Sequence, residues 1–197
     1  VNFAKKEGYE ALCLIFDYGQ RHKKEINAAK KIAQQAGCRY LVEKIRFSWG
    51  GSSLLGTGKR IPQHSRISQG KIPSTYVPAR NIIFLSFALS YAEAVGAQSI
   101  FIGAHNQDYS GYPDCRPEFF KAFSVMALKG TKAGTENKRI IIEAPLLNKG
   151  KAEIIKIGAK LKAPFNLTWS CYKGGKKPCG KCDSCYFRIK GFKEAGI

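Results

Sequence analysis

The sequence lacks a long hydrophobic run and has few acidic residues. Its longest apolar stretch, Ile82 to Leu89, is interrupted by Ser86 and is far shorter than the roughly 20 residues that a membrane-spanning helix needs. We therefore expect no membrane span, and neither a signal-peptide pattern nor an internal repeat is visible. Only 14 acidic residues stand against 33 Lys and Arg, which gives a formal net charge of +19.

This positive charge favours binding of anions. Nucleic acids, nucleotides and anionic metabolites are therefore all admissible partners. The basic residues are spread along the chain instead of forming one tail. Solvated helix faces and a dedicated nucleic-acid surface both remain open as explanations.

Four cysteines in the last thirty residues have a spacing typical of metal ligands, C-x7-C-x2-C-x2-C: Cys171, Cys179, Cys182 and Cys185. Four thiolates form a closed tetrahedral site, which suits structural Zn²⁺ and leaves no position for a reacting water. An iron–sulfur cluster is the alternative. The odd number of remaining cysteines, Cys13, Cys38 and Cys115, argues against a disulfide framework. It favours a reducing, cytoplasmic compartment.

Apolar runs alternate with amphipathic segments along the chain. We expect strands at 11–16, 38–45, 99–104 and 139–144, and helices at 1–7, 21–36, 78–95, 116–128 and 149–161. The helix at 78–95 is apolar nearly all round, so we expect it to be central. Residues 47–77 read as a long excursion and 129–138 as a basic loop. The alternation predicts an α/β fold with a Rossmann-like parallel sheet over residues 1–167 and a zinc-binding module packed on it over 168–197.

Ligands of such sheets bind beyond the carboxyl ends of the strands. Three segments occupy those ends: 17–22, 105–118 and 145–151. The run from 106 to 118 is the densest in acids, tyrosines and arginine, which favours a binding site. A plain strand-to-helix loop is the alternative, with Asp114 as a helix N-cap and Pro117 near the first helical position.

Several motifs in this order resemble those of the 7-cyano-7-deazaguanine synthase family of queuosine-precursor biosynthesis. They are F-D-Y-G-Q-R-H (16–22), Y-V-P-A-R-N (76–81), I-G-A-H-N-Q-D (102–108), D-Y-S-G-Y-P-D-C-R-P-E-F (108–119), K-A-E-I-I-K (151–156) and C-G-K-C-D-S-C (179–185). The resemblance implies a zinc-containing ligase of the pyrophosphatase-loop type with an adenine nucleotide alpha-hydrolase fold. It would convert 7-carboxy-7-deazaguanine and ammonia to the nitrile with ATP and Mg²⁺. It further favours a homodimer that does not require nucleic acid.

One element of the family pattern is not found in these residues. Family members carry a Ser-Gly-Gly-x-Asp-Ser loop that cradles the ATP phosphates, and the present sequence begins after that point. The nearest imitation, residues 48–53, lacks the Asp and precedes no convincing helix. We therefore expect these 197 residues alone to bind ATP poorly and to show little or no turnover.

The expected chemistry assigns roles to individual residues. Activation of a carboxylate and then of an amide builds negative charge on phosphate, which calls for cations and backbone donors. The catalytic candidates are Lys151, Arg80 and Asp108, and the substrate-binding candidates are Ser110, Tyr112, Asp114, Arg116 and Glu118. The nucleotide-binding candidates are Phe16, Asp17, Gly19, Gln20, Arg21 and His22.

Arg80 and Arg116 suit the substrate carboxylate, because a guanidinium binds it through two hydrogen bonds. Asp114 first, and Glu118 second, would receive the N–H donors of the deazaguanine, with Ser110 and Tyr112 in support. Simple structural roles remain alternatives: an exposed lysine in a first helical turn for Lys151, an ion pair for Arg80 and a helix cap for His22.

Two other functions remain open. A tRNA-thiolating enzyme of the same superfamily would need a catalytic cysteine pair, for which Cys115 is the only well-placed member. A non-enzymatic, zinc-containing RNA-binding module would leave the acidic segment at 108–118 without a purpose.

Overall fold

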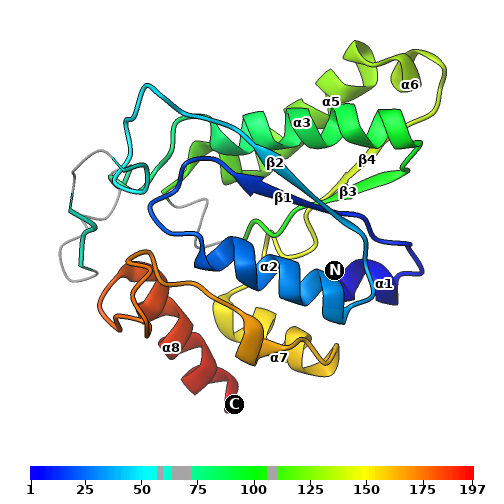
Figure 1. Cartoon of the computed structure of the whole chain (residues 1–197). Coiled ribbons are helices and arrows are strands. Elements are labelled where there is room, and N and C mark those ends of the chain that lie inside the picture. The colour runs from blue at the N-terminus through cyan, green and yellow to red at the C-terminus, as the bar shows by residue number, and fades with distance from the viewer. Residues whose placement is uncertain (57–59, 64–71, 106–110) are drawn as a thin grey trace. The chain divides into compact units, whose positions relative to one another are not determined.

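The computed structural model describes residues 1–56, 60–63, 72–105 and 111–197. These residues divide into two compact units, Val1–Val77 with Lys151–Ile197, and Pro78–Gly150. Strands and helices alternate along the chain (Figure 1), and the strand pairs formed by the described residues are parallel. The predicted α/β class is therefore confirmed. The boundary expected at 167/168 lies inside the first unit, and that division stays a prediction. No helix in the described ranges is both long and apolar enough to cross a membrane.

The first unit contains the parallel pair β1 (Cys13–Asp17) and β2 (Tyr40–Lys44). Helix α1 (Asn2–Lys6) precedes β1, and α2 (Lys24–Gln35) links the two strands. Helix α2 packs on β1 because Ile26 and Ala33 form the buried stripe of an otherwise polar helix. Asp17 is opposite Lys44 at the carboxyl end of the pair, where a ligand is expected.

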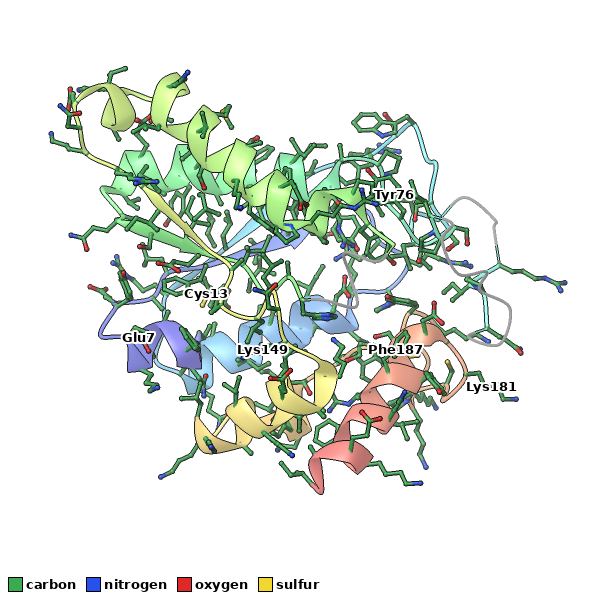
Figure 2. All side chains as sticks on the ribbon, turned by 180° about the vertical axis from the view of Figure 1, so that it is seen from behind. Glu7, Cys13, Tyr76, Lys149, Lys181 and Phe187 are labelled. Atoms are coloured by element: carbon green, nitrogen blue, oxygen red, sulfur yellow. The ribbon has the colours of Figure 1, made fainter. Side chains whose placement is uncertain are left out.

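The same unit contains the C-terminal part of the chain. Helices α7 (Lys151–Lys160) and α8 (Asp183–Ala195) lie side by side, with the short 3₁₀ turn η3 (Phe165–Leu167) between them in sequence (Figure 1). Gly191 permits the close approach, since a Cβ built there would lie 2.8 Å from the Cβ of Lys151. Helix α8 was not among the helices expected from the sequence. Phe187 lies on α8 and Lys181 in the loop before it (Figure 2).

The second unit consists of α3 (Arg80–Val95), β3 (Ser99–Phe101), the 3₁₀ turn η2 (Pro113–Cys115), α5 (Pro117–Gly130), α6 (Lys132–Thr135) and β4 (Ile141–Glu143). Strands β3 and β4 are parallel, with Ser99 opposite Ile141. Aliphatic and aromatic residues of α3 and α5 form the core of this unit with Ala104 and Cys115: Leu85, Leu89, Phe120, Phe123 and Ala127. Cys115 is thus a core residue.

The expectation that the helix at 78–95 is central is wrong. Its buried residues, Asn81, Leu85, Leu89 and Ala92, form a single row along α3. Ile82, Phe87 and Val95 are 43%, 41% and 46% exposed. Helix α3 is therefore apolar on nearly all sides but is buried on one side only.

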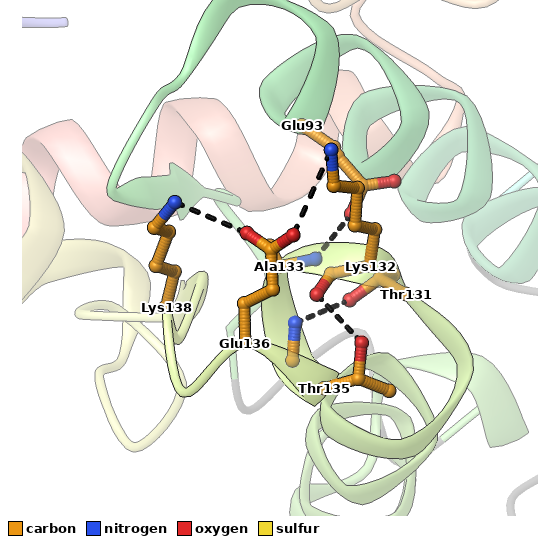
Figure 3. A network of polar contacts seen from close by, with 8 residues as sticks. Glu93, Thr131, Lys132, Ala133, Thr135, Glu136 and Lys138 are labelled. Carbon is orange, nitrogen blue, oxygen red and sulfur yellow. Dashed lines mark hydrogen bonds and ion pairs between the residues drawn. The ribbon is translucent and has the colours of Figure 1, made fainter.

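The basic segment 129–138 is likewise not a plain loop, because it contains α6 (Figure 3). The Thr131 hydroxyl accepts a hydrogen bond from the Gly134 N–H at 3.0 Å and so caps the helix. The carboxylate of Glu93 on α3 accepts a second bond from the Ala133 N–H at 2.7 Å. Glu136 pairs with both Lys132 and Lys138.

The described parts of the excursion at 47–77 are packed against the end of β1. Phe47 lies 5.9 Å from the ring of Tyr18, and Leu55 forms an antiparallel bridge with Gln20. Ser52 and Ser53 are fully buried, and the Ser53 N–H donates to the Ser74 carbonyl at 2.8 Å. Residues 51–56 form turns and a bridge, so the imitation at 48–53 is not followed directly by the helix that a phosphate loop needs.

Candidate functional site

The segment after β1 contains the predicted nucleotide-binding residues. Asp17 accepts a hydrogen bond from Lys23 Nζ at 2.8 Å, and this bond, reinforced by the Gly19 N–H, outweighs partial burial and lowers the pKa of Asp17. Gly19 has a φ of +80°, a left-handed conformation that glycine adopts readily. The chain therefore turns sharply at Gly19, directly beyond the strand end.

Gln20 holds this turn together. Its Oε1 accepts from the Tyr18 N–H at 2.8 Å, and its Nε2 donates to the Phe16 carbonyl at 3.2 Å and to Glu25 Oε1 at 3.1 Å. The side chain is 6% exposed, so these bonds replace water for a buried amide. Both hydrogens of the Nε2 group are used internally, which leaves Gln20 as a structural brace rather than a free donor toward a ribose.

The other members of the predicted nucleotide-binding set differ in exposure. Phe16 is half-buried in β1, whereas Arg21 is exposed and its N–H donates to the Leu54 carbonyl at 3.0 Å. His22 is half-buried just before α2, and its buried Nδ1 has no hydrogen-bond partner among the described residues. The set therefore forms one continuous turn in which Arg21 is the exposed cation.

In the second unit, Asp114 is joined to the start of α3. The Asn81 N–H donates to Asp114 Oδ2 at 2.8 Å, while Asn81 Nδ2 donates to the Asp114 carbonyl at 3.1 Å and to Cys115 Sγ at 3.0 Å. All three residues are buried, at 8%, 5% and 3% exposure. Asp114 therefore does cap a helix, but the helix is α3 and not α5, whose N-cap is Arg116.

The turn into α3 is strained, which explains why it is tied down. Ala79, the N-cap of α3, has a φ of +54°, a conformation that costs a non-glycine residue about 1–2 kcal/mol. The carboxylate of Asp114 satisfies one N–H that the first helical turn leaves unpaired and complements the positive end of the helix. A carboxylate offers about four acceptor positions, so this single bond does not exhaust Asp114.

The remaining predicted residues of the second unit lie around this junction. Arg80 is the first residue of α3, is half-buried and has its Cζ 6.0 Å from the ring centroid of Phe84. Tyr112 packs against the core, whereas Arg116 and Glu118 are exposed at the start of α5. Asp108 and Ser110 lie outside the described residues.

Lys151 is the first residue of α7 in the first unit. It is half-buried, and its Cβ is the atom nearest to a Cβ built on Gly191 of α8. The structure therefore places its stem in the contact between the two helices. A lysine can pack its stem in this way while its ammonium group reaches solvent or a ligand.

The four predicted metal ligands are brought together. Their sulfurs all lie within 4.8 Å of one another, and Cys179 Sγ is 3.9 Å from Cys185 Sγ. Four sulfurs at the Zn–S distance of about 2.3 Å would stand about 3.8 Å apart in a tetrahedron. Cys171, Cys182 and Cys185 are at most 3% exposed. The cluster is therefore compatible with a closed metal site, as its spacing predicted.

The local structure acts on the ionisation of the thiols in opposite directions. Cys182 is the N-cap of α8 and Cys185 lies in its first turn, where the helix dipole favours negative charge. Burial opposes ionisation of Cys179, but N–H groups of Lys181 and Cys182 outweigh it and lower its pKa to about 6. Burial raises the pKa of Cys182, and burial together with the neighbouring thiols raises the pKa of Cys185 to about 12. Binding of a cation would therefore displace protons from this cluster.

Comparison with known proteins identifies the family. A family model described as "Queuosine biosynthesis protein QueC" matches residues 1–196. The chain belongs to this family. The resemblance inferred from the motifs is thereby confirmed.

Curated relatives match nearly all of this chain. A protein named 7-cyano-7-deazaguanine synthase 2 from Desulfitobacterium hafniense is 52% identical over 100% of this chain and 84% of its own length. Proteins named 7-cyano-7-deazaguanine synthase from Acetivibrio thermocellus and Nostoc sp. are 50% and 49% identical over 100% and 98% of this chain and 88% and 86% of theirs.

Three residues with evident roles in the site were missed by sequence reasoning. Asn81 lies inside the Y-V-P-A-R-N motif, which gave it a position but no role. Lys23 and Lys24 read as ordinary basic residues at a helix start. Lys23 contacts Asp17, and Lys24 contacts the Gly175 carbonyl between two of the metal-ligand cysteines. Both contacts depend on the fold, and no local sequence pattern predicts them.

Proposed function

We propose that this chain converts 7-carboxy-7-deazaguanine and ammonia into 7-cyano-7-deazaguanine with the consumption of ATP. The observation that carries this proposal is the match of the entire chain, at about half identity, to proteins named for that product. The buried Asn81–Asp114 junction supports it, because it fixes the predicted substrate segment to the start of a helix. The acyl and nitrile chemistry determines what the site must supply.

A carboxylate does not accept ammonia until one of its oxygens becomes a leaving group. ATP therefore transfers a phosphate-containing group to that oxygen, ammonia displaces it, and an amide results. The amide oxygen needs a second activation before it departs and the C–N triple bond forms. Each activation develops negative charge at phosphate, which cations and backbone N–H groups stabilise. Lys151 and Arg80 are our candidates for these cations, with Asp108 as a candidate for steering protons.

The substrate's deazaguanine edge carries adjacent N–H donors. Asp114 is our first candidate for the acceptor of these hydrogen bonds, and Glu118 is our second. The burial of Asp114 favours it, since a carboxylate hydrogen bond is stronger where water is excluded. Arg116, with an exposed planar guanidinium at the N-cap of α5, suits the substrate carboxylate. Ser110 and Tyr112 complete the proposed set.

The turn after β1 is our proposed adenosine-binding segment. Gly19 lets backbone N–H groups approach a ligand, and exposed Arg21 supplies positive charge next to it. Mg²⁺ would accompany the ATP phosphates. The brace formed by Gln20 gives the segment a fixed shape, which lowers the conformational entropy lost on binding.

We further propose that the metal is Zn²⁺ and that its role is structural. A set of four sulfurs within 4.8 Å suits a single ion, whereas the thiolates of an iron–sulfur cluster are spread around several irons. When bound, zinc would fix the loop and α8 without entering the reaction. A reducing, cytoplasmic location suits such a site. The exposed apolar residues of α3, including Ile82 and Phe87, favour the predicted homodimer.

The proposal is tested by incubating the chain, with the family's phosphate loop restored ahead of residue 1, with the carboxylated base, ATP and ammonium and following the base by mass spectrometry. We expect the amide and then the nitrile to form, with each step dependent on ATP. Omission of ammonium should stop both. Turnover of a tRNA in the absence of any change in the base would instead support a tRNA-modifying enzyme.

A specific observation disfavours the thiolating alternative. Cys115 is 3% exposed, and its Sγ accepts a hydrogen bond from Asn81. A persulfide carrier must be reachable by its sulfur donor, so a core cysteine with a fixed partner is poorly suited to that role.

A further inference from the structure

The loop between the first two metal-binding cysteines, residues 172–178, reaches the start of α2. Gly174 has a φ of +63°, and a Cβ built on it would lie 2.2 Å from the Cβ of His22. Any side chain at this position would therefore overlap His22. The backbone of the loop and the His22 side chain are in direct contact, and only glycine permits that approach.

A second contact is polar. Lys24 Nζ donates to the Gly175 carbonyl at 2.5 Å and to the Lys176 carbonyl at 3.1 Å. The same ammonium group lies 4.5 Å from the ring centroid of Trp169, whose Nε1 donates to the Cys171 carbonyl at 3.0 Å. One lysine thus binds both the loop and the residue that anchors its first cysteine.

The contacts with His22 and Lys24 do not by themselves explain why the loop closes onto α2. The Nδ1 atom of His22 is buried without a hydrogen-bond partner among the described residues, which is unfavourable. The loop also contains Lys173, Lys176 and Lys177 and no acidic residue, so its own charges repel. A source of free energy that closes the loop is therefore needed. Both ends of the loop are metal-ligand candidates, and thiolate–metal bonds can supply that energy.

In sequence, His22 follows the turn braced by Gln20, whose side chain also bonds Glu25 in the first turn of α2. We propose that residues 172–178 act as a metal-dependent strap, and that Lys24 and Gly174 are positioning residues through which metal binding orders the segment 17–22. Binding of the metal and binding of a nucleotide would then be coupled. The nucleotide part of this inference rests on the proposed function.

The first test does not use a nucleotide. Amide hydrogen exchange of residues 20–26 is compared between the zinc-loaded wild-type protein, Lys24→Met, and the control Lys31→Met, which removes an exposed lysine from the same helix. We expect faster exchange in this segment in Lys24→Met, with zinc content unchanged, and wild-type exchange in Lys31→Met. Gly174→Ala should behave as Lys24→Met does. Equal exchange in all four loaded proteins would overturn the strap.

The second test measures the coupling itself, in the chain with the family's phosphate loop restored ahead of residue 1, because these 197 residues alone are expected to bind ATP poorly. Zinc should tighten binding of a non-hydrolysable ATP analogue by a factor within the usual allosteric range of about 5- to 150-fold, and the analogue should tighten zinc binding by the same factor. In Lys24→Met this factor should fall toward 1, whereas a merely structural lysine would leave it unchanged. Absence of analogue binding to the loaded wild-type protein would refute the nucleotide site and the coupling, while the exchange experiment would still decide whether the strap exists.

Discussion

Replacement of Asp114 by Asn separates the two roles of this carboxylate. In the structure, Oδ2 accepts the Asn81 N–H at 2.8 Å. The oxygen of an Asn side chain can accept the same bond, so only the favourable interaction of the charge with the α3 dipole is lost, about 0.3–1 kcal/mol. For a chain of 197 residues this lowers the melting temperature by no more than about 4 °C. Asp114→Ala also leaves the buried N–H unpaired, which costs about 1–3 kcal/mol.

The binding of substrate should change far more. A hydrogen bond to a charged group contributes about 1.5–3 kcal/mol, and the amide of Asn would present an N–H group to the N–H donors of the base. Affinity of Asp114→Asn for 7-carboxy-7-deazaguanine should therefore fall by about 10- to 100-fold. Isothermal titration calorimetry measures the affinity, and differential scanning calorimetry measures the melting temperature of the same sample.

Glu118→Gln is the matched control, because Glu118 is an exposed carboxylate four residues further along the chain and the second candidate. We expect it to bind the base as the wild-type protein does. Wild-type affinity in Asp114→Asn would remove Asp114 from the pocket and leave it as the cap of α3 alone. A loss of affinity confined to Glu118→Gln would transfer the role to that residue.

Three further predictions concern the metal, Cys115 and the α7–α8 contact. Zinc retention should fall as the pH decreases, because protons compete for the Cys182 and Cys185 thiolates, whose pKa values are raised, already at neutral pH, and for the Cys179 thiolate below a pH of about 6; a chromogenic chelator measures the release, and retention independent of pH between 5 and 8 would contradict this reading. The metal-free protein should also lose stability as the pH falls. The Cys179 thiolate stabilises the folded state above its ordinary pKa of 9.0, and this stabilisation is lost as the pH falls through about 6. Cys115→Ser should retain wild-type turnover in the mass-spectrometric assay, because ATP activation makes a nucleophile unnecessary, and an inactive but folded variant would show that the thiol reacts. Gly191→Ala should lower the free energy of unfolding by about 1–3 kcal/mol, since its Cβ would be 2.8 Å from that of Lys151, whereas Gly130→Ala, with its nearest atom at 3.7 Å, should not, as chemical denaturation can verify.

Much of the fold was predictable because its signals are local. The strands at 11–16 and 38–45 were expected from apolar runs, and both were found as β1 and β2 with slightly shorter bounds. The metal cluster was predicted from spacing alone, since a C-x2-C pair brings two sulfurs within reach of one ion regardless of the surrounding fold.

The errors arose where tertiary contacts decide the structure. The apolarity of α3 suggested a central helix, but composition does not show whether a partner covers the far side. Helix α6 depends on Glu93, a residue 40 positions away from the N–H it accepts, and so could not be expected from the basic sequence of that segment. Asp114 was recognised as either a cap or a ligand, and only the fold revealed that the capped helix is α3.

Three of the few acidic residues have structural partners in the fold. Asp17 pairs with Lys23 at a strand end, Asp114 caps α3, and Glu93 caps the turn into α6. Each of these carboxylates has a defined partner that shapes the backbone. With 14 acidic residues against 33 Lys and Arg, most of the positive charge has no acidic counterpart, which gives the net charge of +19. Because ATP and a carboxylated base are both anions, the same deficit that makes the chain strongly basic would concentrate its proposed substrates near the site.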